Sequence, residues 1–146
     1  MISSPTPIQE VADDAIAIIG MDCRFPGAEN IQQFWQNLLD GKDCLTTFDR
    51  DQLIKSGIDP ALIDHPDYVS RKGTLKDYDK FDAAFFGYSP REAEMMDPQH
   101  RLFLQCCWRA LEDAGHTGEG EERDIGVFGG IGMPTYILKN IIGHPK

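Results

Sequence analysis

The stretch "MMDPQHRLFLQCCWRALEDAG", residues 95–115, decides how the rest of the chain is interpreted. Asp97 followed by Pro98 is typical of a helix N-cap and first helical position, and Gly115 suits the left-handed residue that ends a helix. Apolar residues at helical spacing predict one buried face, made of Leu104, Cys107, Trp108, Leu111 and Ala114. A polar stripe is predicted beside it, made of Arg101, Gln105, Arg109 and Glu112. The stretch therefore predicts a long amphipathic helix.

Two short apolar segments on either side of this helix predict buried strands. The segment "AIAIIG", residues 15–20, lacks a polar stripe, which is typical of a central parallel strand covered on both faces. The segment "IGVFGG", residues 125–130, follows the helix and has the same character. Because helices alternate with these strands, we expect an α/β layered fold.

Further elements are indicated by local signals. The segment 30–41, "NIQQFWQNLLDG", predicts a helix with Asn30 as its N-cap and Gly41 after its end. Its predicted apolar face consists of Ile31, Phe34, Trp35, Leu38 and Leu39. Residues 68–75 predict a weak strand, Ser89 and Glu92 form a capping box that starts a short helix, and another helix is expected near Pro134. A dense aromatic cluster precedes the capping box: Phe81, Phe85, Phe86 and Tyr88.

Composition narrows the class of protein. The chain has 146 residues and a net charge of −10, which argues against nucleic acid as a partner because phosphate binding needs clustered Lys and Arg. No run approaches the roughly 18 apolar residues of a membrane span, so no membrane association is expected. Residues 1–14 are expected to be a flexible leader rather than a secretory signal, and 15–146 a partial domain. Four cysteines without disulfide spacing fit a reducing, cytoplasmic location; they are Cys23, Cys44, Cys106 and Cys107.

The adjacent Cys106 and Cys107 raise three alternatives: a reactive thiol, a metal site or a structural core. They lie nine and ten residues past the N-cap, far from the positive end of the helix that would favour a thiolate. Burial of Cys107 on the apolar face would raise its pKa. No Cys or His stands at zinc spacing, so no metal is expected. The structural interpretation is favoured.

The remaining polar and glycine signals are weaker. No histidine has catalytic or metal spacing, so surface or capping roles are expected for His65, His100, His116 and His144. A solvated turn is expected for Asp77, Asp79 and Asp82. The glycines of "GVFGGIGMP", residues 126–134, stand where a phosphate-cradling turn would, but no GxGxxG or GK[ST] motif is present. Close approach of this backbone to a ligand or another element is favoured, with tight packing as the alternative.

Four segments taken together resemble the opening of a β-ketoacyl synthase, most nearly the ketosynthase domains of modular polyketide synthases and of hybrid polyketide–nonribosomal peptide assembly lines. These segments are "IAIIGMDCRFPGA", "FWQNLLDGKD", "FDAAFFGYSPREAEMMDPQHRLFLQCCWRALEDAG" and "IGVFGGIGMPTY". The resemblance runs from about residue 15 to about residue 142. It implies the N-terminal portion of a thiolase-like αβαβα layered fold.

The resemblance also implies an activity and partners. Members of the family form homodimers and condense an enzyme-bound acyl thioester with a malonyl-type extender in a decarboxylative Claisen reaction. They bind no cofactor directly, because both groups arrive on the phosphopantetheine arm of an acyl carrier protein. The segment after the second expected strand lies beside the acyl pocket in relatives, which makes substrate-binding candidates of Gly130, Ile131, Gly132 and Met133.

The family's catalytic motifs are missing from this sequence. A cysteine in a Thr-Ala-Cys-Ser-Ser type motif and two downstream histidines perform the chemistry, and none of the three motifs occurs here. The tail "KNIIGHPK", residues 139–146, resembles one histidine motif but stands in the wrong place and carries an extra Ile142, so His144 receives no catalytic role. No catalytic residue is therefore assigned, and the chain alone is expected to be inactive.

Two other functions remain open. The chain could be a free-standing, non-catalytic interaction or scaffold protein derived from a ketosynthase, binding a synthase or a carrier protein. A thiol-based redox role, suggested only by Cys106 and Cys107, would need a thiol pKa well below about 8.5.

Overall fold

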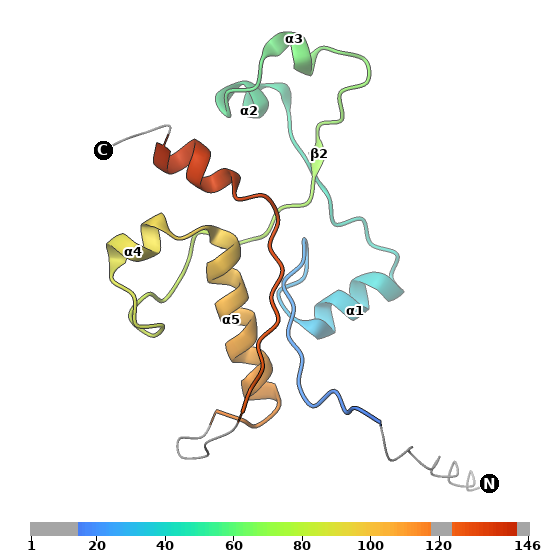
Figure 1. The fold of residues 1–146 in the computed structure, drawn as a ribbon. Coiled ribbons are helices and arrows are strands. Elements are labelled where there is room, and N and C mark those ends of the chain that lie inside the picture. The colour runs from blue at the N-terminus through green and yellow to red at the C-terminus, as the bar shows by residue number, and fades with distance from the viewer. Residues whose placement is uncertain (1–14, 118–123, 143–146) are drawn as a thin grey trace, which may run out of the picture.

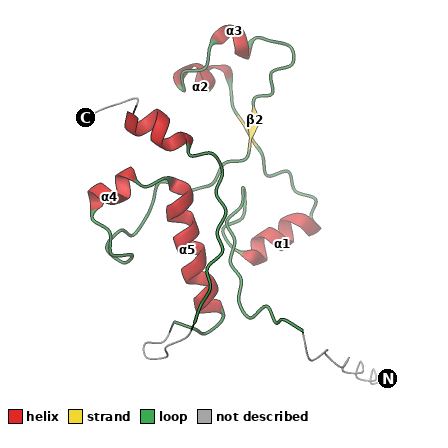
Figure 2. Cartoon of the chain, in the orientation of Figure 1, coloured by secondary structure: helices red, strands yellow, loops and turns green. Residues whose placement is uncertain are grey.

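The computed structural model describes residues 15–117 and 124–142. Figure 1 shows the arrangement of its elements, and Figure 2 shows that long loops join mostly short helices. In chain order the elements are α1 (Ile31–Leu39), β1 (Thr46–Thr47), α2 (Arg50–Lys55), α3 (Pro60–Ile63), β2 (Arg71–Lys72), α4 (Pro90–Met95), α5 (Pro98–Asp113) and the π-helix η1 (Ile137–Ile142). The expected leader, residues 1–14, and His144 lie outside the described residues.

The helix α5 confirms the prediction made from the stretch 95–115. The Asp97 side chain accepts a hydrogen bond from the backbone N–H of Gln99 at 2.9 Å, and Pro98 occupies the first position. Gly115 follows the C-cap with φ of +70°, the left-handed conformation in which glycine carries no Cβ penalty. The limits of α5 are therefore set by local sequence.

The other predicted helix starts are also confirmed. Asn30 accepts a hydrogen bond from the backbone N–H of Gln33 at 2.9 Å, and Gly41 after α1 has φ of +60°. At α4, Ser89 and Glu92 form both hydrogen bonds of the capping box. Residues 135–142 are helical, as expected near Pro134. Each of these elements begins where a side chain satisfies an orphan backbone donor or where proline presets the backbone.

The weak strand expected within residues 68–75 is present as β2. It pairs antiparallel with β1, with Thr46 opposite Lys72 and Thr47 opposite Arg71. The hydroxyls of Thr46 and Thr74 lie 2.7 Å apart and Arg71 forms an ion pair with Asp43, so side chains reinforce a ladder of only two residues per strand.

The two buried strands expected at residues 15–20 and 125–130 are corrected by the structure. Both segments are extended but belong to no strand, and among the described residues no backbone hydrogen bond joins them. Their side chains are exposed, with Ile16 at 95% and Phe128 at 97%. The physical reason is that a strand exists only when a neighbour pairs with its backbone, and the described residues supply no such neighbour to either segment.

Both extended segments nevertheless pack against α5. A Cβ on Gly20 would meet the Ala110 carbonyl oxygen near the C-terminal end of α5, and one on Gly129 would meet the Phe103 ring in the N-terminal half of the helix. The Gly132 N–H donates to Gln99 at the helix start. Figure 1 shows the blue segment that contains Gly20 and the red segment that contains Gly129 running along α5. Helix α5 therefore packs against two chain segments that come from opposite ends of the sequence.

The predicted faces of α5 are correct only in part. Trp108 packs edge-to-face on Phe85 with ring centroids 4.8 Å apart, within the expected aromatic cluster. Within the predicted polar stripe Arg109 and Glu112 are exposed, but Arg101 is only 8% exposed, and the half-buried Gln105 donates its amide to the Lys80 carbonyl at 3.3 Å. The latter two side chains face chain segments distant in sequence, which helical periodicity alone does not reveal.

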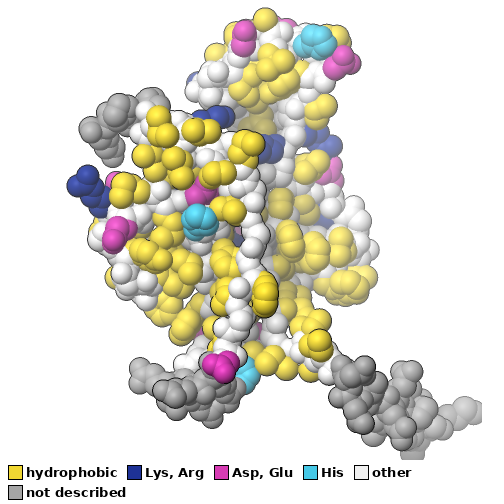
Figure 3. All heavy atoms as spheres, viewed as in Figure 1, with side chains coloured by type: hydrophobic (Ala, Val, Ile, Leu, Met, Phe, Trp, Pro, Cys, Tyr) yellow, Lys and Arg dark blue, Asp and Glu magenta, His cyan; other side chains and the backbone are white. Residues whose placement is uncertain are grey.

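The predicted apolar face of α1 is mostly uncovered. Phe34 packs against Phe25 with ring centroids 4.5 Å apart, but Trp35 is 60% exposed. Figure 3 shows broad apolar areas on the viewed surface. Among the described residues, no helix is both long enough and apolar enough to cross a membrane.

Candidate functional site

The predicted substrate-binding segment, residues 130–133, lies beside the N-terminal half of α5. The Gly132 N–H donates a hydrogen bond to the Gln99 side-chain oxygen at 3.0 Å, and a Cβ on the preceding Gly129 would lie 3.2 Å from the Phe103 ring. Nothing lies within 4 Å of a Cβ placed on Gly130. The close approach expected of these glycines is therefore an approach to another element of the chain.

The two larger side chains of the segment are exposed to different degrees. Ile131 is 50% exposed and Met133 is 79% exposed. The segment thus offers a flexible thioether and a branched alkyl group as contact surface, which suits an apolar ligand. These four consecutive residues lie along one side of α5, and we call the segment 130–133 the wall.

Tyr136 fixes the far end of this wall. Its hydroxyl donates to the Glu94 carbonyl oxygen in α4 at 2.7 Å, and the Arg101 guanidinium stands 5.9 Å from the centre of its ring. A cation at this distance from an aromatic face is attracted by the ring quadrupole. Gln99 and Tyr136 therefore anchor the segment to two neighbouring helices.

Two buried charged residues contact the anchors: Asp97 accepts from the Gln99 N–H, and Arg101 lies over the Tyr136 ring. Asp97 is 4% exposed and Arg101 is 8% exposed. One oxygen of Asp97, Oδ2, and the Nε of Arg101 have no hydrogen-bond partner among the described residues. Leaving buried polar atoms unpaired costs free energy, so these atoms mark a place where a further polar group would be stabilised.

Sequence reasoning missed the roles of Gln99, Arg101 and Tyr136. It assigned Arg101 to a polar stripe and Asp97 to the N-cap. Their i, i+4 spacing with opposite charges at the start of a helix is the signal that could have drawn attention to this pair. Nothing in the sequence indicates that Tyr136 would cover Arg101, because the two lie far apart in the chain.

The environment of Cys106 supports a structural role. Burial and a hydrogen bond to the Asp22 carboxylate raise its pKa to about 11, so the thiol is neutral at pH 7. Burial also raises the pKa of Cys23. Neither group has the thiolate character that a nucleophile needs.

The histidines within the described residues lie at the surface, as expected. His65, His100 and His116 are all exposed. The His65 Nδ1 accepts from the Asp67 backbone N–H at 3.2 Å, which is a local turn contact. In the part of the chain that the structure describes, no three His, Cys, Asp or Glu side chains are grouped so as to hold a metal ion.

Comparison with known proteins identifies the family of this chain. Residues 13–144 match the model of the β-ketoacyl synthase N-terminal domain. The chain therefore belongs to the β-ketoacyl synthase family, and its fold is an N-terminal portion of the thiolase-like α/β fold of ketosynthases.

The similar proteins are polyketide synthases. The chain is 43% identical over 134 residues to a phenolphthiocerol/phthiocerol polyketide synthase of Mycobacterium tuberculosis, covering 92% of the chain and 9% of that protein. It is 45% identical over 135 residues to the polyketide synthase PksL of Bacillus subtilis, covering 90% of the chain and 3% of that protein. The chain thus spans less than a tenth of the length of these relatives.

A solved ketosynthase structure supports the same family assignment. Ketosynthase twelve of the bacillaene polyketide synthase from Bacillus amyloliquefaciens matches with a TM-score of 0.59 and 44% identity, over 66% of this chain and 17% of that one. The chain is thus an N-terminal ketosynthase segment of the polyketide synthase type.

Proposed function

We propose that the chain contributes the N-terminal part of a ketosynthase that condenses an acyl thioester with a malonyl-type extender. The match of residues 13–144 to the β-ketoacyl synthase N-terminal domain carries this proposal. In this reaction the acyl group moves from a pantetheine sulfur to an enzyme cysteine. Loss of carbon dioxide from the extender then leaves an enolate, which attacks the acyl carbonyl and releases the cysteine.

The partners follow from that chemistry. An acyl carrier protein would present both substrates on phosphopantetheine, so no cofactor need bind directly to this chain. The remainder of the ketosynthase and a second copy of the domain would complete the structure. The exposed extended segments 15–20 and 125–130 support this, because each presents backbone groups without partners among the described residues.

We assign the segment 130–133 to a wall of the acyl pocket. Gln99 and Tyr136 hold its ends, while Ile131 and Met133 remain exposed to contact an acyl chain. A wall fixed through its backbone keeps its shape whichever apolar group lies against it. Variation at Ile131 and Met133 would therefore change acyl preference without disturbing the anchors.

The nucleophile is assigned to a residue outside this chain. Cys106 is held neutral by its surroundings, and the sequence contains no Thr-Ala-Cys-Ser-Ser motif. The chain would contribute binding and scaffolding, while a cysteine and two histidines elsewhere would perform bond formation.

The decisive experiment uses the protein as its source makes it. An antibody raised against residues 15–117 isolates the native polypeptide, which is then incubated with an acyl pantetheine thioester and analysed by intact and peptide mass. We expect a mass far above 16.4 kDa and one acyl group on a cysteine other than those of this chain.

Two outcomes would contradict the proposal. Acylation of Cys106 or Cys107 would show that this chain carries the nucleophile. A native protein of 16.4 kDa that takes up no acyl group would favour the non-catalytic scaffold function instead. Pretreatment with iodoacetamide is the control, since it blocks acylation only at a reactive thiol.

A further inference from the structure

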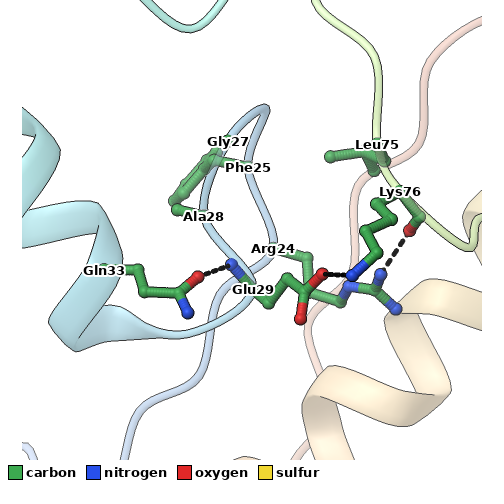
Figure 4. Close-up of a pocket in the computed structure, with 8 residues that line it drawn as sticks. All are labelled: Arg24, Phe25, Gly27, Ala28, Glu29, Gln33, Leu75 and Lys76. Carbon is green, nitrogen blue, oxygen red and sulfur yellow. Dashed lines mark hydrogen bonds and ion pairs between the residues drawn. The ribbon is translucent and has the colours of Figure 1, made fainter. Parts of the chain in front are cut away.

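A cavity of about 310 Å³ lies between the loop 24–29 and the segment 75–76 (Figure 4). None of its lining residues belongs to the acyl-pocket wall or to its anchors. They are Arg24, Phe25, Gly27, Ala28, Glu29, Gln33, Leu75 and Lys76. Its volume is at the lower end of the range typical of small-molecule sites, which limits any occupant to a compact molecule.

Charged groups converge at this cavity. Figure 4 shows the Arg24 guanidinium donating to the Lys76 carbonyl oxygen and the Lys76 ammonium paired with the Glu29 carboxylate, at 2.9 Å. Two cations and one carboxylate line the cavity, and the nearby Asp77 carboxylate, which also acts on both cations, is itself paired with Lys80 at 2.8 Å. The lining therefore carries one more positive than negative charge, which attracts an anion.

The ion pair that joins the two walls is easily opened. The Lys76 side chain is 73% exposed and that of Glu29 is 48% exposed, so water screens their attraction. Glu29 is the carboxylate that an incoming anion would replace. Because Arg24 remains fixed by its bond to the Lys76 carbonyl, the second cation would stay in place during that exchange.

The opposite side of the cavity is apolar and preformed. Phe25 and Ala28 exchange two backbone hydrogen bonds of 2.9 Å, and the Asn37 amide donates to the Gly27 carbonyl at 2.9 Å. Gly27 has φ of +72°, and a Cβ there would come within 2.8 Å of the Cys44 sulfur. The loop is therefore closed and tightly packed before any ligand arrives, which lowers the entropic cost of binding.

We propose that this cavity binds a small organic anion, a carboxylate or phosphate monoester on a compact apolar body. The anionic group takes the place of Glu29 beside Lys76 and Arg24, and the apolar body lies against Phe25 and Leu75. This inference is independent of the proposed ketosynthase function, because it uses none of the residues assigned to the acyl pocket.

The test is a calorimetric titration of the polypeptide as its source encodes it with butyl phosphate, with inorganic phosphate and 1-butanol as comparison ligands. We expect butyl phosphate to bind more tightly than either comparison ligand, because only it uses both halves of the cavity. Lys76→Gln should weaken binding about tenfold, as expected on losing a hydrogen bond between charged groups.

Glu29→Gln provides the sharper prediction, since it removes the competing carboxylate. Butyl phosphate should then bind about twofold to fivefold more tightly, which matches the strength of an exposed ion pair. Matched controls outside the cavity are Lys72→Gln in β2 and Glu112→Gln in α5, which should leave the affinity within twofold of the parent. Circular dichroism confirms that each variant remains folded.

Three results would overturn the proposal. Equal binding of butyl phosphate and 1-butanol would show that charge is not recognised. Equal weakening by Lys76→Gln and Lys72→Gln would show only general attraction to positive charge. Weaker binding after Glu29→Gln would show that the carboxylate does not compete with the ligand.

Discussion

The Cys106 thiol shows how one residue's chemistry is set by its neighbours. Its position in mid-helix removes the favourable field of a helix N-terminus, and burial then disfavours the charged form. Asp22 adds to this by accepting a hydrogen bond from the neutral thiol, while the charges of Arg109 and Arg24 lower the pKa. Burial and Asp22 prevail, and the group stays protonated.

Alkylation of Cys106 should therefore require strongly basic solution. The rate depends on the thiolate fraction, which rises only as pH approaches the pKa of about 11. Asp22→Asn removes the neighbouring negative charge, which lowers the pKa and should speed labelling at pH 8, with burial still keeping it slow. Iodoacetamide labelling followed by peptide mass measures both. Half-maximal labelling below pH 9 in the parent chain would contradict the assigned environment.

Gly20 is required by space rather than by backbone conformation. A Cβ there would lie 2.3 Å from the Ala110 carbonyl oxygen and 2.8 Å from the Ala114 Cβ, both at the C-terminal end of α5. Helix backbone cannot give way without breaking its own hydrogen bonds. The contact therefore sets how closely residues 15–20 approach the helix.

Gly20→Ala should destabilise the chain by about 1–3 kcal/mol, the usual cost of overpacking. Urea denaturation followed by circular dichroism measures the change. Gly130→Ala is the matched control, because nothing lies within 4 Å of its added Cβ, and it should alter stability little. Equal effects of the two substitutions would contradict the packing of this segment on α5.

At the scale of elements, α5 organises the described chain. Phe85 covers it on one side, the extended segments that contain Gly20 and Gly129 lie along another, and Tyr136 covers Arg101 near its start. Two residues of the predicted polar stripe contact other parts of the chain: Arg101 lies over the Tyr136 ring and the Gln105 amide donates to the Lys80 carbonyl. The other two, Arg109 and Glu112, are exposed.

Tyr136→Phe tests the anchor between α4 and the segment that leads into η1. Loss of the hydroxyl removes the 2.7 Å hydrogen bond to Glu94 and should cost about 1 kcal/mol, while the ring stays over Arg101. Hydrogen exchange should become faster in residues 134–142. Tyr136→Ala removes the ring as well and should produce a larger effect; equal effects would mean that the cation–π contact contributes nothing.

At the scale of the whole molecule, apolar surface exceeds what the chain buries. Within the described residues, buried apolar side chains are few, namely Ala28, Leu53 and Ala93, whereas Ile16 and Phe128 are almost fully exposed. Extended segments with unpaired backbone and apolar side chains are templates for pairing with another chain. The net charge of −10 opposes association but is spread over the sequence.

The 146-residue chain on its own should therefore self-associate through these segments. The double variant Ile18→Lys and Phe128→Lys should shift the protein toward the monomer of 16.4 kDa in sedimentation velocity. Leu62→Lys on α3, also at an exposed apolar position, is the control and should have little effect. If the control dissolves the assemblies equally well, general surface charge rather than strand pairing governs association.

The sequence by itself determined the helix limits, because these depend on residues that are neighbours in the chain. Asp97 with Pro98, the pair Ser89 and Glu92, and Gly115 act within one turn of the backbone, so their patterns predicted α5 and α4 correctly. The family resemblance was also evident, since several motifs occur in the expected order. The substrate-binding role of residues 130–133 stays a prediction, and their place beside α5 is a finding of the tertiary structure.

Only the tertiary structure decided which groups are buried and which segments become strands. Arg101 is covered by Tyr136, and Gln105 meets the backbone of Lys80, through contacts between residues far apart in sequence. The apolar runs at residues 15–20 and 125–130 have the composition of strands but not their hydrogen bonds. Composition fixes what a segment prefers, whereas a strand needs a second backbone beside it, and that partner is a property of the assembled fold.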